Sequence, residues 1–211
     1  MIEVQGLSIP MQLGELCDAT RTALLVYDMQ AGITAQMKDG GHIVSKCASL
    51  IAAARAVGMR IAYSQHLSSP KKWMGATQFR TAMAWQKTTD PAAVRAPFLR
   101  GKPAAAIVKE LEPTPDDLVV EKLAMSAFEG TALAYAMQDC KLTGVAICGI
   151  ALEIGIEPTV RHATDLGFIP IVVTDACGAG NAEAGERALE TMRFMGEAIL
   201  TDAASFCAHC R

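Results

Sequence analysis

The chain has 211 residues, 51% of them hydrophobic and 19% charged, and carries a formal charge of −3. This composition excludes intrinsic disorder, and no apolar stretch approaches the roughly 20 residues that a membrane helix needs. Because 19 basic residues stand against 22 acidic ones, we expect no broad basic face and no nucleic-acid partner.

The cysteines and the N-terminal residues indicate a compartment. Seven cysteines are scattered through apolar segments, which is typical of reduced thiols rather than of a disulfide framework. Residues 1–6 show no basic region followed by an apolar core, so no signal peptide is expected. We therefore expect a cytoplasmic protein without membrane contact, folded as a single domain over residues 1–211 because no repeat or linker divides it.

Short β-rich runs alternate along the chain with longer segments of helical period. In chain order, the pattern predicts a strand at 22–28, a helix at 43–57, a strand at 60–64, a helix at 104–111, a strand at 117–121, a helix at 129–138, a strand at 142–151, a helix at 158–166, a strand at 168–174, a helix at 182–195 and a strand at 197–200. Apolar strands separated by helices predict a three-layer α/β/α domain with a six-stranded, mainly parallel, Rossmann-like sheet.

A long irregular segment, residues 68–102, interrupts this alternation and contains both tryptophans, Trp73 and Trp85. Such segments in compact domains are usually lids or binding loops, or are disordered, and the tryptophans argue against disorder. We predict a substrate lid or an oligomer contact, in which Arg80 and Lys87 are the cations expected to meet an anionic substrate. The alternative is a solvated surface loop with an aromatic anchor.

Ligands of parallel α/β sheets bind beyond the carboxyl ends of the strands, which directs attention to three clusters. Asp28 closes the first strand, where partial burial would favour its protonated form, although it could also only cap a helix. Lys122 ends the third strand at the same mouth, where a lysine beside a carboxylate can place a proton, unless it lies in solvent.

The third cluster, residues 148–159, is a strand followed by a tight apolar loop and a helix opened by Pro158. Backbone N–H groups at such a helix start favour negative charge in the crevice. Gly155 lies in this loop, where glycine is either a steric necessity or makes room for substrate or water.

Together, these clusters resemble the isochorismatase-like hydrolases, which include nicotinamidases, carbamoylsarcosine amidases and isochorismatases. The resemblance spans about residues 21–203. It rests on residues 24–30, on Lys122 followed by 126–128, on 149–151 running to 159–163, and on 175–176. It implies a six-stranded parallel sheet, and homo-oligomers are common among the similar proteins.

The sequence departs from this family at one decisive position. Most members are cysteine hydrolases whose nucleophile lies six residues after the glycine that matches Gly149, and that position here is Gly155. Cys148 lies on the strand and cannot replace it. We therefore expect no covalent acyl-enzyme. The catalytic residues are then Asp28, Lys122 and Gly155, with water as the nucleophile.

True isochorismatases are similar in carrying glycine at this position. Their reaction implies that Asp28 protonates a vinyl-ether carbon, that water captures the oxocarbenium ion and that Lys122 places charge or orders water. Two features oppose isochorismate itself: the charge of Glu153 in the loop, and the absence of a Gly-Pro-Gly pattern from residues 68–102. The residues predicted to bind substrate are Gln30, His66, Arg80, Trp85, Phe128, Ile150, Ala151, Glu153 and Ile154.

No metal or other cofactor is expected. Nicotinamidases of this family bind a metal through an Asp-x-His pair after the second strand, whereas here the segment is Ser64-Gln65-His66. Residues 207–210 (Cys-Ala-His-Cys) resemble half a zinc site, but without a second pair we predict a frayed tail.

Three functions stay open on the sequence alone. The first is a cysteine-independent hydrolase of a small polar molecule, with a vinyl ether as the candidate bond. The second is an amide or ureide hydrolase in which water attacks directly and Asp28 acts as base. The third is an inactive member that binds a small molecule or a partner protein, against which the retention of both Asp28 and Lys122 argues.

Overall fold

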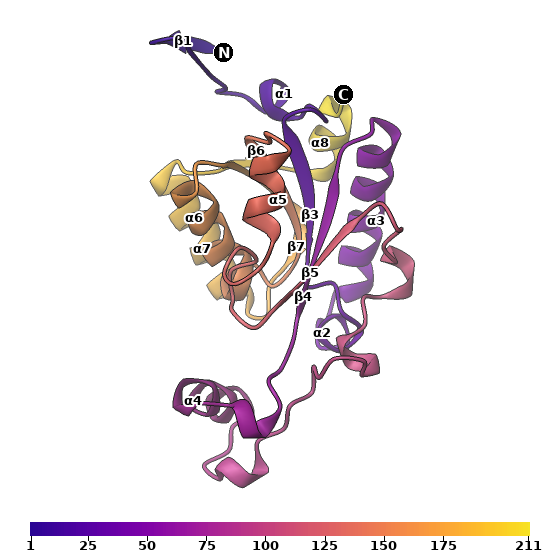
Figure 1. The fold of residues 1–211 in the computed structure, drawn as a ribbon, viewed down its shortest axis with the longest axis vertical. Coiled ribbons are helices and arrows are strands. Elements are labelled where there is room, and N and C mark those ends of the chain that lie inside the picture. Colours follow the sequence, from indigo (N-terminus) through magenta and orange to yellow (C-terminus); the bar gives the residue numbers. More distant parts are fainter.

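The computed structural model describes residues 1–211, and a six-stranded sheet forms its centre. Figure 1 shows this sheet between helices. The strands run in the order β5-β4-β3-β6-β7-β8, and every neighbouring pair is parallel. Their bounds are β3 (Thr22–Tyr27), β4 (Ile61–His66), β5 (Leu118–Lys122), β6 (Gly144–Ile150), β7 (Ile169–Gly178) and β8 (Ile199–Thr201). The predicted six-stranded α/β/α fold is confirmed. The strand order reverses between β3 and β6, which is where such sheets bind ligands.

Helices cover both faces of the sheet (Figure 1). One face carries α1 (Leu13–Leu16), α3 (Gly40–Ala56) and α8 (Ala203–His209), and the other carries α5 (Leu133–Asp139), α6 (Glu157–Asp165) and α7 (Ala182–Met195). Strand β3 shows why. Leu24 and Val26 pack into the first core, while Leu25 and Tyr27 pack into the second, so the strand is apolar on both sides. Each fully buried aliphatic side chain of this kind contributes about 1.5–3 kcal/mol.

The chain between β4 and β5 leaves the sheet and forms a separate excursion (Figure 1). It contains α4 (Ala76–Trp85) and the 3₁₀ turns η1 (Lys71–Trp73), η2 (Pro91–Ala93), η3 (Pro103–Ala105) and η4 (Lys109–Leu111). The helix predicted at 104–111 is wrong. Residues between η3 and η4 are extended because their backbone pairs with the chain after β3, where Ala31 N–H donates to Ala106 O and Val108 N–H donates to Met29 O.

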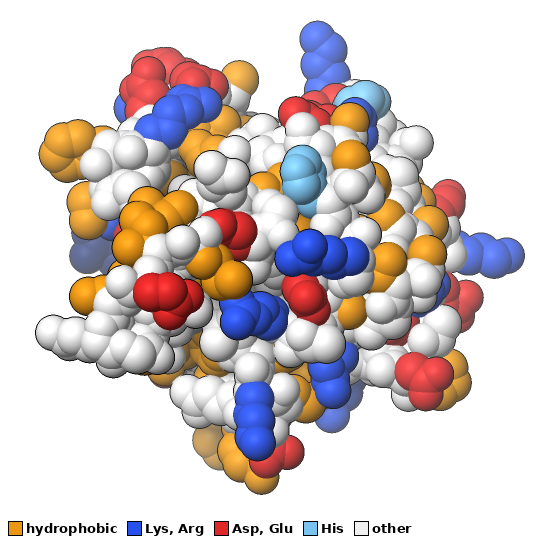
Figure 2. All heavy atoms as spheres, turned by 90° about the horizontal axis from the view of Figure 1, so that it is seen from above, with side chains coloured by type: hydrophobic (Ala, Val, Ile, Leu, Met, Phe, Trp, Pro, Cys, Tyr) orange, Lys and Arg blue, Asp and Glu red, His pale blue; other side chains and the backbone are white.

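Three parts of the chain carry structure that the sequence pattern did not predict: the two ends and the segment after β3. A hairpin of β1 (Ile2–Val4) and β2 (Leu7–Ile9) opens the chain, and α2 (Ala31–Thr34) follows β3. The tail predicted to fray instead belongs largely to α8, which buries Phe206 against the core. No helix has the length and apolar character to cross a membrane. On the end of the molecule shown in Figure 2, acidic and basic side chains are interspersed.

Candidate active site

Asp28 follows β3 and is held there by β4. Its φ of 47° lies in the left-handed region, which aspartate tolerates better than most residues. The Ser64 hydroxyl donates to Asp28 Oδ1 at 2.6 Å, and the Asp28 N–H donates back to the Ser64 carbonyl and hydroxyl oxygens, each at 3.2 Å. Asp28 is 4% exposed. The strand ends therefore fix this carboxylate in place.

Lys122, the last residue of β5, completes a buried ion pair. Its Nζ lies 2.7 Å from Asp28 Oδ2, and the lysine side chain is fully buried. The ammonium also donates to Ala124 O at 3.2 Å. Burial lowers the pKa of Lys122, and the Asp28 carboxylate opposes that change. The structure thus brings Asp28 and Lys122 together, as the sequence predicted.

The loop after β6 forms the opposite wall of the site. The Ile150–Ala151 peptide bond is cis, and a single π-helical turn, η5 (Leu152–Ile156), leads into α6. Gly155 and Ile156 both donate their N–H groups to Ala151 O, at 3.0 and 3.1 Å. This compact turn brings Gly155 against the end of β3.

Neither cysteine near this loop is suited to attack a substrate. The Cys148 pKa is raised by a hydrogen bond to Cys47 and by burial, and burial also raises the pKa of Cys177. A thiol with a raised pKa provides little thiolate at neutral pH. The site therefore offers no side-chain thiolate nucleophile.

These elements enclose a cavity of about 320 Å³, which we call the inner chamber. Its lining includes Tyr27, Asp28, His66, Ile150, Ala151, Ile154 and Gly155. Among all its lining residues, only Tyr27, Asp28 and His66 carry ionisable side chains. The chamber is thus a mostly apolar space with a carboxylate in its wall.

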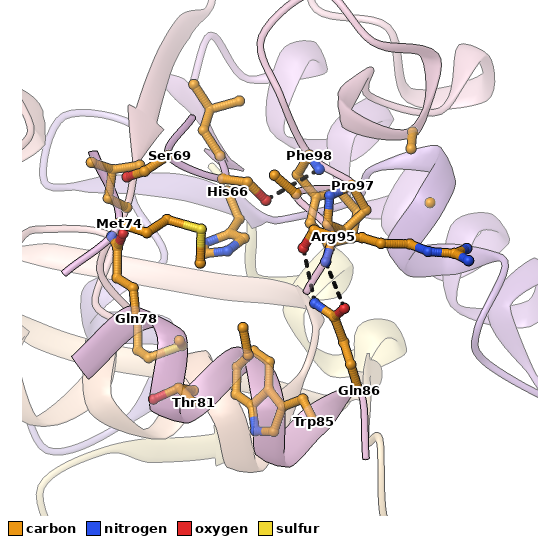
Figure 3. A pocket seen from close by; sticks show the side chains of 18 of the residues that line it. His66, Ser69, Met74, Gln78, Thr81, Trp85, Gln86, Arg95, Pro97 and Phe98 are labelled. Atoms are coloured by element: carbon orange, nitrogen blue, oxygen red, sulfur yellow. Dashed lines mark hydrogen bonds between the residues drawn. The ribbon is translucent and has the colours of Figure 1, made fainter. Parts of the chain in front are cut away.

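A second cavity, the outer chamber, measures about 710 Å³ and is formed largely by the excursion (Figure 3). Met74, Gln78 and Thr81 line it, and His66, Trp85 and Phe98 line both chambers. Gln86 ties the end of α4 to the facing segment through two hydrogen bonds with the Arg95 backbone, at 2.8 and 2.9 Å. In Figure 3 the Arg95 side chain extends away from the cavity. The two chambers therefore adjoin at shared residues.

His66 lies at this junction, as the sequence predicted for a residue facing the substrate. Its ring packs edge-on against Phe98, with centroids 5.9 Å apart. Burial lowers the pKa of His66, and the positive charge of Lys122 lowers it further by a smaller amount. The imidazole is therefore neutral at pH 7 and offers one donor and one acceptor nitrogen.

Two residues predicted to bind substrate have structural partners instead. The Gln30 amide donates to His66 O at 2.9 Å and Ala105 O at 2.8 Å, and its oxygen accepts from His66 N. Gln30 therefore clamps the excursion to β4. Phe128 stacks on Phe168, with centroids 5.6 Å apart, inside the second core. Neither residue lines the inner or outer chamber.

Three charged residues also lie outside the two chambers. Arg80, on α4, and Lys87 are exposed. Glu153 points toward the start of α7, where its Oε1 accepts from Asn181 N–H at 2.8 Å. One oxygen of this carboxylate is therefore bonded outside the two chambers, whereas Oε2 is buried without a hydrogen-bond partner, and the Glu153 charge lines neither chamber.

Sequence reasoning missed several residues that shape the site, notably Tyr27, Ser64, Phe98 and Met125. The sequence could have indicated Tyr27 and Ser64, because both lie near the ends of the strands that lead to Asp28 and His66. Phe98 and Met125 lie in loops, where no periodicity marks which side chains turn inward.

The donor set for a metal is incomplete at this site. Ser64 occupies the place of the expected acidic ligand, and its hydroxyl is bonded to Asp28. Across the chain, no group of three or more His, Cys, Asp and Glu side chains is arranged to hold a metal ion. The residues present therefore do not fit a metal ligated as in the nicotinamidases.

Known proteins share this chain's sequence and fold. The Isochorismatase domain model matches residues 22–205. The isochorismatase family protein YecD of Escherichia coli O157:H7 is 30% identical over 179 residues, covering 79% of this chain and 84% of its own. Ureidoacrylate amidohydrolase RutB of Pantoea ananatis is 26% identical, covering 80% and 73%.

Among solved structures, a cysteine hydrolase from Pseudomonas syringae pv. phaseolicola 1448A superposes with a TM-score of 0.77 at 22% identity. The match covers 91% of this chain and 93% of that one. This likeness shows the shared fold, and the domain match covers most of the chain. The protein described here therefore belongs to the isochorismatase family of hydrolases.

Proposed function

We propose that the protein is a cysteine-independent hydrolase in which the Asp28–Lys122 pair supplies a proton and water is the nucleophile. The observation that carries this proposal is the Asp28 carboxylate, held between Lys122 Nζ and Ser64 Oγ in the wall of the inner chamber. Position 155 faces the same chamber and carries no side chain that could attack.

The ion pair holds one proton that can be transferred. Lys122 Nζ lies 2.7 Å from Asp28 Oδ2, so an ammonium proton can pass directly to the carboxylate. Burial lowers the pKa of Lys122, which makes its ammonium a better proton donor than an exposed lysine. Asp28, as a protonated acid, then faces the substrate.

The bond that best fits these groups is a vinyl ether. Asp28 protonates the terminal vinyl carbon, and the ether oxygen stabilises the resulting oxocarbenium ion. Water adds to the cationic carbon and returns a proton to the pair. The hemiketal then breaks its original ether bond and releases an alcohol and a carbonyl compound. Only proton transfer and water are needed, and such acid catalysis contributes about 10²–10⁴-fold.

The chambers also indicate the substrate's charge. Their lining is mainly apolar or amide and hydroxyl in character, Lys122 is neutralised by Asp28, and the Arg95 side chain extends outward. A dicarboxylate would meet no free cation there. We therefore expect an enol ether with at most one negative charge, whose reactive end enters the inner chamber.

An amide or ureide hydrolase is the second candidate, and the relative RutB, named as a ureidoacrylate amidohydrolase, favours it. Asp28 would then act as base and activate water against a carbonyl carbon. This route requires both a base for water and stabilisation of the oxyanion, whereas both Asp28 oxygens already have partners in Lys122 Nζ and Ser64 Oγ.

The test is a substrate panel of neutral enol ethers, isochorismate and small amides, with keto-acid or ketone release and ammonia release followed together. Carbonyl release that disappears in Asp28→Asn supports the proposal. Ammonia release that disappears in this variant overturns it in favour of the amidohydrolase. Ligand binding to the chambers without either product contradicts a hydrolase and supports a binding protein.

The pH profile provides a second check. The proton donor is lost when the Lys122 ammonium loses its proton, and burial lowers the pKa at which this occurs. The rate should therefore fall as pH rises, beginning below the range in which an ordinary lysine titrates. A rate that increases through the same interval would indicate a base and contradict the acid role.

A further inference from the structure

Tyr27, which no step above uses, lies against both Lys122 and Gly155. It is the last residue of β3, directly before Asp28, and is only 1% exposed. One end of its side chain lies against Gly155, and the face of its ring lies under Lys122. A side chain placed between the proton-transfer pair and the loop of the missing nucleophile can influence both.

The ring face is a second partner for the lysine. Lys122 Nζ lies 4.5 Å from the centroid of the Tyr27 ring, within the distance at which an ammonium is attracted by an aromatic face. The titratable groups that face Lys122 are Tyr27 at the end of β3, Asp28 directly after it, and His66 from β4. Because His66 is neutral, the ring and the carboxylate are what favour the charged lysine.

The hydroxyl end occupies the space of a side chain at position 155. A Cβ added to Gly155 would overlap Tyr27 Oη and would lie 2.5 Å from Cζ and 2.8 Å from Cε1. Real Cβ atoms do not approach other atoms this closely. The Tyr27 hydroxyl donates to Met125 O, which fixes the ring in this position. Tyrosine at 27 therefore requires glycine at 155.

We propose that Tyr27 is a positioning residue of the Asp28–Lys122 pair: its ring face holds the Lys122 ammonium beside Asp28, and its hydroxyl end occupies the space where a nucleophile at position 155 would begin. This inference rests on the proposed function for its catalytic meaning, but both of its physical statements concern the protein without substrate.

The tyrosine is not itself a nucleophile. Burial, followed by the charge of Asp28, raises the pKa of Tyr27, so the phenol stays protonated. Its proton is directed to Met125 O. Tyr27 consequently acts through Lys122 and through the shape of the chamber.

The first experiment measures the titration of Lys122 directly, by ¹³C NMR of its side-chain methylenes. Tyr27→Leu removes the ring, and Tyr27→Phe keeps it. We expect Lys122 to lose its proton at lower pH in Tyr27→Leu than in the unmodified protein, and Tyr27→Phe to leave the titration unchanged. Equal titration in all three proteins would overturn the statement about the ring.

The matched control is Tyr63→Leu, because Tyr63 is equally buried but packs on the other face of the sheet. It should lower stability without moving the Lys122 titration. An equal shift in Tyr63→Leu would mean that any lost aromatic group alters the lysine, and would also overturn the proposal.

The second experiment is a double-mutant cycle on thermal stability. Gly155→Ala should lower Tm strongly when Tyr27 is present, and much less in the Tyr27→Leu background, where the overlapping atoms are gone. Additive effects would contradict the shared space. In the permissive background, Gly155→Cys should be alkylated by iodoacetamide at residue 155, as mapped by mass spectrometry.

These readouts separate the two proposals. If the substrate panel fails but the titration and the cycle behave as expected, the positioning role stands and the reaction is wrong. If carbonyl release is found and Tyr27→Leu does not move its alkaline limit to lower pH, the positioning role is wrong and the reaction stands.

Discussion

The inner and outer chambers differ in what builds them and in how their charges are used. The inner chamber is formed by strand ends and the turn after β6, and its charges are buried and paired. The outer chamber is formed largely by residues 67–98, and Trp85, at its junction with the inner chamber, is 57% exposed. This difference supports the proposal that the strand ends hold the reacting groups and that the excursion selects the substrate.

This division has a physical reason. Strand ends are constrained by the hydrogen-bond ladder and by two cores, which allows the structure to hold a buried ion pair at 2.7 Å. A loop excursion has few buried residues and varies easily, so it suits adaptable contacts rather than proton transfer. Substitutions in the inner chamber should thus change rate or stability, and those in the outer chamber should change binding.

The largest effect is expected from Asp28→Asn. The amide keeps the hydrogen bond from Ser64 but cannot donate the carboxyl proton, so kcat/KM should fall by about 10³-fold with an unchanged fold. Steady-state kinetics and circular dichroism measure the two quantities. Asp175→Asn is the control, because Asp175 lies in β7 of the same sheet but pairs with Lys46 outside both chambers. Equal losses of kcat/KM in Asp28→Asn and Asp175→Asn would contradict a specific catalytic role for the inner chamber.

Lys122→Met should lower the free energy of unfolding, because the Asp28–Lys122 ion pair also stabilises the fold. Removing the cation leaves the Asp28 carboxylate buried without its partner, which costs about 3 kcal/mol in unfolding free energy at pH 7. The loss should shrink as pH falls, because protonation of Asp28 removes the unpaired charge. Urea unfolding at several pH values measures it.

The matched control for this variant is Lys46→Met. Lys46 and Asp175 form an ion pair at 2.7 Å, but each side chain is about a third exposed. Such pairs are worth less than about 1 kcal/mol. The double variant Asp28→Asn with Lys122→Met should recover part of the lost stability, and no recovery would show that the lysine acts by packing alone.

The same division separates what the sequence could predict from what it could not. The location of Asp28, Lys122 and Gly155 at one edge of the sheet was predictable. Apolar runs locate the strand ends, and parallel strands bring those ends to the same edge. Gln30 and Phe128 lie beside the same strand ends, yet one bonds to backbone and the other packs in the core. Proximity in sequence does not determine which way a side chain turns.

The outer chamber was predicted only in outline, as a substrate lid or oligomer contact over residues 68–102 that contains Trp85. Residues 68–102 show no sustained period, so α4 was not predicted and the inward position of Phe98 had no signal. The contact between Tyr27 and Gly155 joins β3 to η5 across more than a hundred residues, and only coordinates reveal a space that two residues share. A prediction of chemistry from single positions therefore missed the side chain that explains the glycine.

In the outer chamber, Trp85→Ala should weaken binding and leave the chemical step intact. The indole lines both chambers, so its loss removes apolar contact with substrate and should raise KM by about fivefold, or about 1 kcal/mol, at nearly constant kcat. Trp73→Ala is the control, because Trp73 is 80% exposed and lines neither chamber. A fall in kcat of Trp85→Ala equal to that of Asp28→Asn would place chemistry in the excursion.

The smallest effect is expected from Gln86→Leu, which tests whether the excursion is held as one unit. This change removes both hydrogen bonds between Gln86 and the Arg95 backbone. Each bond is worth about 1 kcal/mol, so the Arg95 amide should exchange its hydrogen about fivefold faster while Tm stays almost constant. Gln138→Leu, on the exposed side of α5, should leave that amide unaffected. If hydrogen exchange of the Arg95 amide is unchanged in Gln86→Leu, packing on Trp85 and Phe98 holds the outer chamber together without the two Gln86 hydrogen bonds.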